Sequence, residues 1–384
     1  MKEVRVAVIG VGIMGSSHAQ RFEKGEIEGA TLAAICDIDP AVRAKWSDRV
    51  PVFASADDLI AAKAVDAVVI ATPHYFHTTI GIAALRAGLH VLVEKPISVH
   101  KADCERLIAA HRGRKQVFSA MFQQRTEPHY QRLRNLIQRG ELGEFLRFNW
   151  IITNWFRSEA YYASGGWRAT WRGEGGGVLM NQCPHNLDML QWLVGMPKRV
   201  RAFCRFGRYH DIEVEDDVTA YMEFPNGATG LFITTTGEAP GTNRLEIVGT
   251  RGKLVAEHGR LSFTRNEIPC DEFCRTTPEL FGKPPVWNVD IPVSGEGGGH
   301  RAILQNFIDA IREGQPLIAP AREGQKSVEL ANAMLLSTWT DRTVELPFSG
   351  AVFERHLKKL IAKSRLKKST TTPGMVDLDA SFNR

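Results

Sequence analysis

Four polar residues in two short motifs have the types and spacing that proton transfer requires. Lys95 stands in Val-Glu-Lys-Pro (93–96) directly after an apolar run, and Asn181, His185 and Asp188 follow a triple glycine. Spacings of four and three residues place side chains on one face of a helix. A partly buried lysine near a bound cation has a lowered pKa, which prepares it to exchange protons. The sequence therefore predicts a site in which a lysine and a histidine move a proton.

Each of these residues also has an ordinary structural interpretation. Lys95 could be a solvated lysine beside a glutamate. Asn181 could cap the helix, which we expect to begin near that residue because Pro184 suits a first turn. His185 and Asp188 could be a hydrogen-bonded core histidine and a surface aspartate. Spacing alone supports the two interpretations of the helix equally.

A glycine motif lies near the start of the chain. The apolar run Val4–Ile9 is followed by Gly10-Val11-Gly12-Ile13-Met14-Gly15 and then by a helical pattern. In the strand–turn–helix motif G-x-G-x-x-G, the first glycine allows the tight turn, the second lets a diphosphate approach, and the third allows close helix packing. The helix N-terminus then offers free NH groups to the phosphates. The motif predicts dinucleotide binding, whereas a glycine-rich loop with no ligand is the alternative.

An acidic residue closes the second expected strand. Asp37 lies at the distance from the glycine motif where a carboxylate accepts hydrogen bonds from the adenosine ribose. A carboxylate there favours NAD over NADP, although nearby Arg43 could accommodate a 2′-phosphate. Asp37 could instead cap the helix that begins near Pro40, but Asp39 is better placed for that role.

The order of the elements predicts an α/β protein with two domains. Apolar strands alternate with helices up to Arg125, which is typical of a parallel sheet covered on both faces, a Rossmann dinucleotide-binding domain over residues 1–125. Strands with alternating polarity then predict a C-terminal α+β domain over residues 126–349 with a large, mostly antiparallel open sheet. Residues 350–384 read as a basic C-terminal tail.

The composition bears on which classes of partner the protein binds and on its cellular compartment. The 384 residues carry a net charge of +5, and the basic segment 355–368 lacks the aromatic residues and motifs of a nucleic-acid site. No apolar stretch is long enough to span a bilayer, and the first strand begins too early to leave room for a secretory signal. Six scattered cysteines indicate reduced thiols and no metal site. We expect a cytoplasmic protein with no nucleic-acid or membrane partner.

The segment 153–177 is rich in aromatic residues and arginine. Aromatic faces suit the CH faces of sugar rings, and arginines donate hydrogen bonds to hydroxyls or carboxylates. The same residue types also fill cores and subunit interfaces. The candidate substrate contacts are Trp155, Arg157, Tyr161, Trp167 and Arg168.

Together these motifs resemble one family, the Gfo/Idh/MocA oxidoreductases. The resemblance rests on the glycine motif, Ala-Thr-Pro-His-Tyr-Phe-His (71–77), Glu-Lys-Pro (94–96), Met-Phe-Gln-Gln-Arg (121–125) and the glycine-led helix with its histidine and aspartate, in that order. It implies reversible hydride transfer between NAD and a secondary alcohol of a sugar, cyclitol or glycoside. It also implies a homodimer or homotetramer formed through the open sheet.

The resemblance assigns roles to individual residues. Lys95 matches the lysine that contacts the reacting hydroxyl, and His185 matches the usual proton acceptor or donor. Asn181 stands where many dehydrogenases of the family have aspartate, so we expect it to position substrate without taking a proton. Asp188 is expected to orient the imidazole or bind a hydroxyl. The implied cofactor contacts are Gly10, Gly12, Ile13, Met14, Gly15, Asp37, Thr72, Pro73, His77, Glu94, Lys95 and Gln123.

Two other functions remain open at this point. Some relatives keep NAD bound and cleave or rearrange a glycoside with no net redox change, and others are non-catalytic sensors of NAD or sugar. The presence of both Lys95 and His185 disfavours a sensor. A cis Lys95–Pro96 bond is also expected, because cis bonds concentrate at X-Pro steps.

Overall fold

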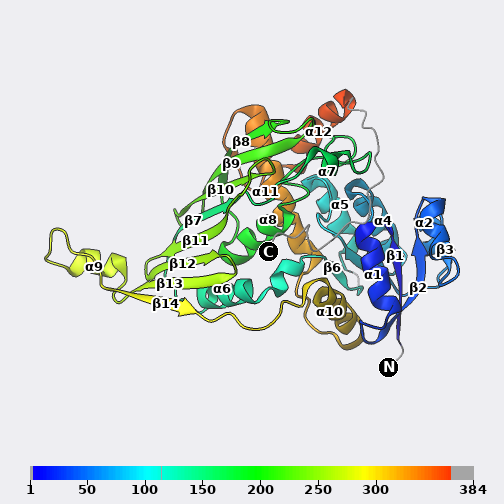
Figure 1. Ribbon diagram of the computed structural model, residues 1–384, viewed down its shortest axis with the longest axis horizontal. Coiled ribbons are helices and arrows are strands. Elements are labelled where there is room, and N and C mark those ends of the chain that lie inside the picture. The colour runs from blue at the N-terminus through cyan, green and yellow to red at the C-terminus, as the bar shows by residue number, and fades with distance from the viewer. Residues whose placement is uncertain (1–2, 114, 365–384) are drawn as a thin grey trace.

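The computed structural model describes residues 3–113 and 115–364, which form two sheets side by side (Figure 1). The first sheet has six strands in the order β3-β2-β1-β4-β5-β6, and every pairing is parallel. Its elements are β1 (Val4–Ile9), α1 (Ile13–Glu23), β2 (Ala30–Cys36), α2 (Pro40–Ala44), β3 (Val52–Phe53), α3 (Ala56–Ala61), β4 (Ala67–Ile70), α4 (His74–Arg86), β5 (His90–Val93), α5 (Lys101–His111) and β6 (Phe118–Ala120). This arrangement confirms the Rossmann-type sheet.

Because all pairings are parallel, the carboxyl ends of the strands lie at one edge of this sheet. Just beyond the strands, main-chain NH groups bond across to neighbouring strands, Ala71 to Ile9 at 2.8 Å and Glu94 to Ile70 at 2.9 Å. The strands can lie side by side because β4 is apolar and fully buried on both faces. The glycine turn, the 71–77 segment and Glu94 are thereby delivered to the same edge, where ligands bind in open α/β folds.

The second sheet has nine strands in the order β14-β13-β12-β11-β7-β10-β9-β8-β15. All its pairings are antiparallel except that of β7 with β10, which confirms the mostly antiparallel sheet. Its strands are β7 (Phe145–Ile152), β8 (Arg199–Phe206), β9 (Glu215–Glu223), β10 (Thr229–Thr235), β11 (Asn243–Gly249), β12 (Gly252–Glu257), β13 (Arg260–Asn266), β14 (Val286–Ile291) and β15 (Val344–Glu345).

Helices cover one face of this sheet and leave large apolar side chains exposed elsewhere on its strands. The remaining elements are η1 (Gln123–Thr126), α6 (Pro128–Gln138), α7 (Glu159–Ala163), α8 (Pro184–Val194), α9 (Cys270–Thr276), α10 (Gly299–Glu313), α11 (Ala321–Thr340) and α12 (Gly350–Lys363). Along β8, Val200, Ala202 and Cys204 are buried while the intervening Phe203 is 58% exposed. The other exposed apolar side chains of the sheet include Leu146, Ile151, Tyr221 and Leu231.

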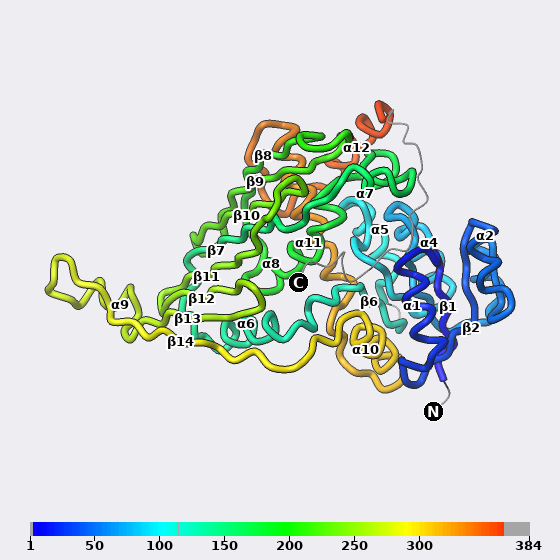
Figure 2. Tube along the Cα trace, in the orientation of Figure 1, coloured from blue at the N-terminus to red at the C-terminus, as the bar shows by residue number. Residues whose placement is uncertain are grey.

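One excursion leaves the body of the protein. Between β13 and β14 the chain runs out through α9 and returns, and the tube in Figure 2 shows this arm projecting beyond the end of the sheet. Leu280 and Phe281 on the arm are 91% and 94% exposed. Sequence periodicity predicted neither α9 nor β14, since neither has a buried side to impose a pattern.

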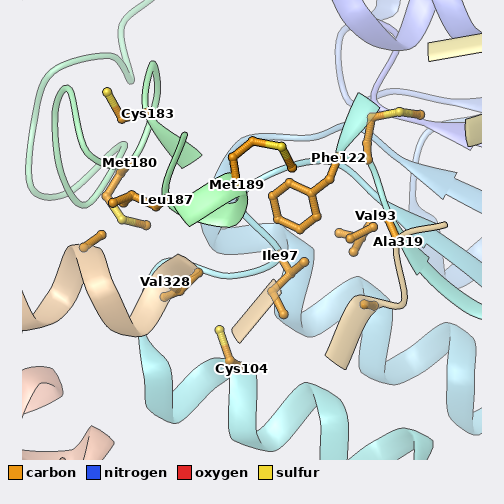
Figure 3. Packing of buried hydrophobic residues seen from close by; sticks show 14 of the residues in the cluster. Val93, Ile97, Cys104, Phe122, Met180, Cys183, Leu187, Met189, Ala319 and Val328 are labelled. Atoms are coloured by element: carbon orange, nitrogen blue, oxygen red, sulfur yellow. The ribbon is translucent and has the colours of Figure 1, made fainter. Parts of the chain in front are cut away.

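The C-terminal third returns to the first sheet. Ala120 on the edge strand β6 donates its NH to the carbonyl of Ala319 at 3.0 Å, and Ser119 forms a bridge with Pro320. Helix α11 starts there and runs behind α8 to reach β8 (Figure 1). Figure 3 shows the shared core, in which apolar side chains from β5, α5, α8 and α11 pack together. The two sheets therefore share one hydrophobic core.

Residue 350 begins a helix, which differs from the expected tail. Helix α12 covers residues Gly350–Lys363, and its Phe353 and Leu357 are buried. Glu354 bonds to Arg106 of α5 at 2.7 Å. The basic charges mark the outer face of an amphipathic helix, and residues 365–384 lie outside the described part of the chain.

Two expectations from composition can be examined directly. All six cysteines are free thiols, four of them buried, as the scattered spacing predicted. Within the described residues, no helix combines the length and apolar character needed to cross a membrane.

Candidate functional site

In the glycine turn at the start of α1, two glycines are required by the fold and the third leaves space for a ligand. Gly10 has φ +84°, and a Cβ there would lie 2.9 Å from Ala71 backbone atoms. A Cβ on Gly15 would lie 1.8 Å from the carbonyl oxygen of Gly10. A Cβ on Gly12 would meet nothing within 4 Å, so this position faces open space beside the first NH groups of α1. Gly12 thus leaves room for a phosphate to approach the backbone.

This contrast predicts that two alanine variants fail in different ways. Gly15→Ala is expected to lower the melting temperature by several degrees or prevent folding, because its Cβ meets backbone that cannot move aside. Gly12→Ala is expected to keep the wild-type melting temperature and lose roughly 10-fold or more in NAD affinity. Thermal unfolding and titration with NAD would measure both, and a Gly12→Ala protein that bound NAD normally would contradict this assignment.

Asp37 lies half-buried beside the turn, one residue after β2. Its Oδ2 accepts from the NH of Val11 at 2.9 Å, and its Oδ1 accepts from the NH of Asp39 at 2.9 Å. Asp39, and not Asp37, caps α2 by accepting from Ala41 at 2.8 Å. Arg43 donates to the main-chain carbonyls of Asp37 and Ile38 at 2.7 and 2.9 Å. The carboxylate keeps free lone pairs for ribose hydroxyls, because each oxygen accepts only one of these bonds.

The 71–77 segment contributes a loop and the start of α4. Thr72 Oγ1 is buried without a hydrogen-bond partner among the described residues, and so is Oε1 of Gln123. His77 differs from the expected cofactor contact. Its two ring nitrogens lie 2.8 Å from the carbonyl oxygens of Pro96 and Thr72, so the ring joins these two loops and has no nitrogen left for a ligand.

Glu94 and Lys95 follow β5 at the same edge, and the Lys95–Pro96 bond is cis as expected. Glu94 Oε1 accepts from His18 Nε2 at 2.7 Å. Burial alone would raise the pKa of Glu94, but the hydrogen bond and charge of His18 outweigh it and lower this pKa to about 2. The ring of His300 on α10 lies 5.6 Å from that of His18. Glu94 is therefore held as an anion beside Lys95.

Lys95 and His185 are the two side chains expected to move the proton. Lys95 Nζ donates to the main-chain carbonyl of Asn181 at 2.8 Å. His185 is 3% exposed, and neither ring nitrogen has a hydrogen-bond partner among the described residues. Burial, reinforced by the charge of Lys95, lowers the pKa of His185 well below its usual range. Burial also lowers the pKa of Lys95. Burying a histidine whose ring nitrogens have no hydrogen-bond partner costs free energy, unless a bound ligand supplies the partner.

The expected one-face trio is only partly realised. Helix α8 begins at Pro184 after Cys183, so Asn181 lies in the turn before the helix. Asp188 is 0% exposed, and its two oxygens accept from Arg125 at 2.7 and 2.6 Å. Asp188 therefore does not orient His185 or face a substrate. It neutralises a buried arginine, which the spacing could not reveal because Arg125 is 63 residues away.

The aromatic and arginine side chains of 153–177 are interleaved. The guanidinium of Arg157 lies 5.3 Å from the Trp155 ring and 5.1 Å from the Tyr161 ring. The guanidinium of Arg168 lies 4.8 Å from both Tyr161 and Trp167. Tyr161 Oη is 3.4 Å from Oδ1 of Asn181. The structure thus brings all five candidate contacts into one cluster beside Asn181.

Sequence reasoning missed four charged or polar side chains at this site: His18, Arg125, Glu174 and His300. Two of them stand inside motifs of the sequence, Arg125 in Met-Phe-Gln-Gln-Arg and Glu174 between glycines. The available signal was a charged residue inside a motif that is otherwise uncharged. His300 carried none, because its partners come from the other end of the chain.

The triple-glycine loop is held by hydrogen bonds to the buried carboxylate of Glu215 on β9. Its Oε1 accepts from the NH groups of Gly177 and Leu179 at 2.8 and 3.1 Å. Its Oε2 has no hydrogen-bond partner among the described residues. Burial raises the pKa of Glu215 to about 7, despite the bonds that favour the anion.

The raised pKa of Glu215 predicts that its contribution to the stability of the fold falls as pH rises. A carboxyl whose pKa is higher in the folded state stabilises that state at low pH, and this contribution is lost as pH rises from 4.5 through about 7. The loss amounts to about 3 kcal/mol from the size of the shift. Glu215→Gln keeps the accepting oxygen and removes the titration. Its melting temperature relative to wild type is expected to rise between about pH 5 and pH 8, and an unchanged difference would refute the assignment.

The residues at this edge fit a dinucleotide. Gly12 leaves an open approach to the N-terminus of α1, and Asp37 presents a carboxylate beside the same turn. Thr72 and Gln123 offer buried polar atoms that have no partner among the described residues.

Comparison with known proteins agrees with this geometry. Residues 4–122 match the oxidoreductase family with an NAD-binding Rossmann fold, and residues 130–255 match the C-terminal domain of the same Gfo/Idh/MocA group. An inositol 2-dehydrogenase from Salmonella typhimurium is 32% identical over 363 residues, covering 90% of this chain and 97% of the relative.

Two further relatives extend the comparison. An inositol 2-dehydrogenase from Corynebacterium glutamicum is 33% identical over 198 residues, so the match spans 50% of this chain and about half, 55%, of that relative. The WlbA dehydrogenase from Chromobacterium violaceum, solved with NADH and UDP-GlcNAcA, is 29% identical. Its structure superimposes with a TM-score of 0.78 over 91% of this chain and 97% of that one.

Because the two family matches together span more than half of the chain, and a relative that is 32% identical aligns over 90% of it, this chain belongs to the Gfo/Idh/MocA oxidoreductases and its first domain is an NAD-binding Rossmann domain.

Proposed function

We propose that this protein oxidises a secondary hydroxyl of a sugar, cyclitol or related carbohydrate, with NAD as the hydride acceptor. The observation that carries the proposal is His185, whose two buried ring nitrogens have no partner among the described residues, next to the Lys95–Asn181 contact. Lys95 lies at the sheet edge that also presents the glycine turn, and its charge acts on His185 of α8. The named relatives also support the proposal, since they are inositol 2-dehydrogenases or a dehydrogenase solved with a nucleotide sugar.

The proposed chemistry divides between the two central side chains. His185, kept neutral by burial, accepts the proton of the reacting hydroxyl. The ammonium of Lys95 stabilises the negative charge that develops on that oxygen. When bound, NAD supplies the hydride acceptor at its nicotinamide ring. Asn181 contributes hydrogen bonds to the substrate but cannot take a proton.

The aromatic and arginine cluster supports a carbohydrate as substrate. The rings of Trp155, Tyr161 and Trp167 provide apolar faces, and Arg157 and Arg168 provide donors beside them. Planar arginines also pair well with carboxylates. Sugar acids therefore belong in the substrate panel next to neutral sugars and inositols.

The test is NADH formation, followed by absorbance, from NAD and a panel of inositols, sugars, glycosides and sugar acids, with NADP in parallel. We expect turnover with NAD on at least one class of compound and weaker turnover with NADP, because Asp37 repels a 2′-phosphate. Glycoside cleavage without NADH would instead indicate redox-neutral chemistry. Tight NAD binding with no reaction of either kind would favour a sensor.

We also propose that the protein is a cytoplasmic homodimer or homotetramer that associates through the nine-stranded sheet. The exposed apolar side chains on the sheet, including Phe203 and Leu231, support an interface there. The six free thiols support a reducing compartment. We propose no nucleic-acid or membrane partner.

A further inference from the structure

Both carboxylate oxygens of Glu174 accept hydrogen bonds in the interior of the site. Oε2 accepts from the main-chain NH of Ala169 at 2.6 Å, and Oε1 accepts from the side-chain amide of Asn181. Glu174 is 2% exposed. A carboxylate accepts at both ends, whereas a glutamine accepts at only one. The NH of Ala169 is part of the backbone and cannot rotate away. The side chain at position 174 must therefore always present a hydrogen-bond acceptor to it.

The opposite side of the Asn181 amide is fixed by Tyr161. The Tyr161 oxygen accepts from Arg168 Nη1 at 2.9 Å and from Gln182 Nε2 at 3.1 Å. Two donors already point at this oxygen, so its own hydrogen is directed at Oδ1 of Asn181, 3.4 Å away. The amide is therefore oriented from both sides, with NH₂ toward Glu174 and one lone pair of Oδ1 toward Tyr161, and the second lone pair of Oδ1 remains for a substrate donor.

Asn181 is also the residue of this segment that opens onto the site. From Glu174 to Gln191, every other residue is buried and Asn181 alone is partly exposed. Its main-chain carbonyl accepts from Lys95, and His185 follows one helical turn later. An oxygen in this place accepts a hydrogen bond from a substrate hydroxyl, whereas an NH₂ group would repel the same hydrogen.

We propose that Glu174 is a positioning residue that holds the Asn181 amide with its oxygen toward the substrate, so that the site selects a compound with a hydrogen-donating hydroxyl next to the reacting carbon. This inference rests on the proposed dehydrogenase function. Glu174 touches no reacting atom and acts through Asn181.

The inference predicts an unusual pattern among three variants. In Glu174→Gln the introduced oxygen must accept from Ala169, so the introduced NH₂ faces Asn181 and forces its amide to turn over. We expect KM for the best carbohydrate to rise roughly 10- to 100-fold with a smaller change in kcat and an unchanged Kd for NAD. Asn181→Asp alone places two carboxylates in contact and is expected to be impaired as well.

The double variant Glu174→Gln/Asn181→Asp is the decisive arm. The introduced NH₂ then donates to one oxygen of the introduced carboxylate, and the other oxygen again faces the substrate. We expect KM within about threefold of wild type, because the acceptor is restored. A residue with only a structural role would not be rescued by damaging its neighbour.

The matched control is Glu215→Gln, a buried carboxylate that holds the same loop but keeps its bonds when converted to an amide. It is expected to leave KM unchanged. A wild-type KM in Glu174→Gln, or no recovery in the double variant, would overturn the inference.

Melting temperatures of the same three variants separate this inference from the proposed function. We expect Asn181→Asp to lower the melting temperature and added Glu174→Gln to restore it. If wild type forms no NADH from any compound, the proposed function fails, and this cycle still decides whether the pair is coupled. Additive changes in melting temperature would overturn the pairing.

Discussion

Replacing Lys95 with methionine is expected to lower kcat for NADH formation by about a thousandfold or more. The variant loses the ammonium that stabilises the developing alkoxide and keeps the length and apolar stem of the side chain. Glu94, its anionic neighbour, is held separately by His18 and is expected to stay in place. NADH formation at saturating substrate, with the Kd for NAD measured in the same protein, would test this.

Retained NAD binding is the internal control for the Lys95→Met variant. The glycine turn, Asp37 and α1 are built from other residues, so an intact Kd shows that the first domain is folded. A variant that turns over at more than a tenth of the wild-type rate would remove Lys95 from the mechanism. In that case Arg168, a cation whose charge acts on Lys95, would become the candidate for charge stabilisation.

Replacing His185 with asparagine is expected to lower kcat/KM by a factor of about 10² to 10⁴, the usual contribution of a general base. Asparagine keeps a polar side chain in the pocket but cannot accept a proton at neutral pH. Burial lowers the pKa of His185 below 6.5, so the neutral base persists into mildly acidic solution. The acid limb of the wild-type pH profile is therefore expected below pH 6.5, and it should vanish in the variant.

Lys95 sets the other limb of the same profile. Because burial lowers its pKa from 10.5, the charged form is lost at a lower pH than in an ordinary lysine, and kcat/KM is expected to fall there. A profile with an acid limb above pH 6.5 would contradict the neutral, buried state of His185. An acid limb that survives in the asparagine variant would assign it to a different group.

The sequence was most informative where chemistry and local geometry coincide. The turn at Gly10–Gly15, the acidic residue after β2 and the lysine after β5 each follow a strand, and a strand ending is visible as the end of an apolar run. Asp188 shows the limit of this approach. Its spacing from His185 matched a shared helix face, but its partner Arg125 comes from another element and takes both oxygens.

Contacts between distant segments set the remaining features. His77 carries the residue type of a ligand contact, yet two carbonyls from separate loops occupy its ring. Glu174 looked like one residue in a glycine-rich loop, and only the folded chain shows that it meets Asn181. Such pairings depend on the packing of whole elements, so no local pattern reports them.

The return of the C-terminal third to the first sheet has a consequence for recombining members of this family. The edge of β6 is covered at Ala319, Lys101 finds its buried counter-charge in Glu329 at 2.6 Å, and Arg125 bonds to Glu323 at 2.6 Å. A chimera that exchanges only residues 1–125 splits these contacts between two parents, so it keeps the two ion pairs only if the incoming segment carries the same charges at positions 101 and 125. The cooperative unit for such an exchange therefore combines residues 1–125 with residues 299–340, which are far apart along the gene.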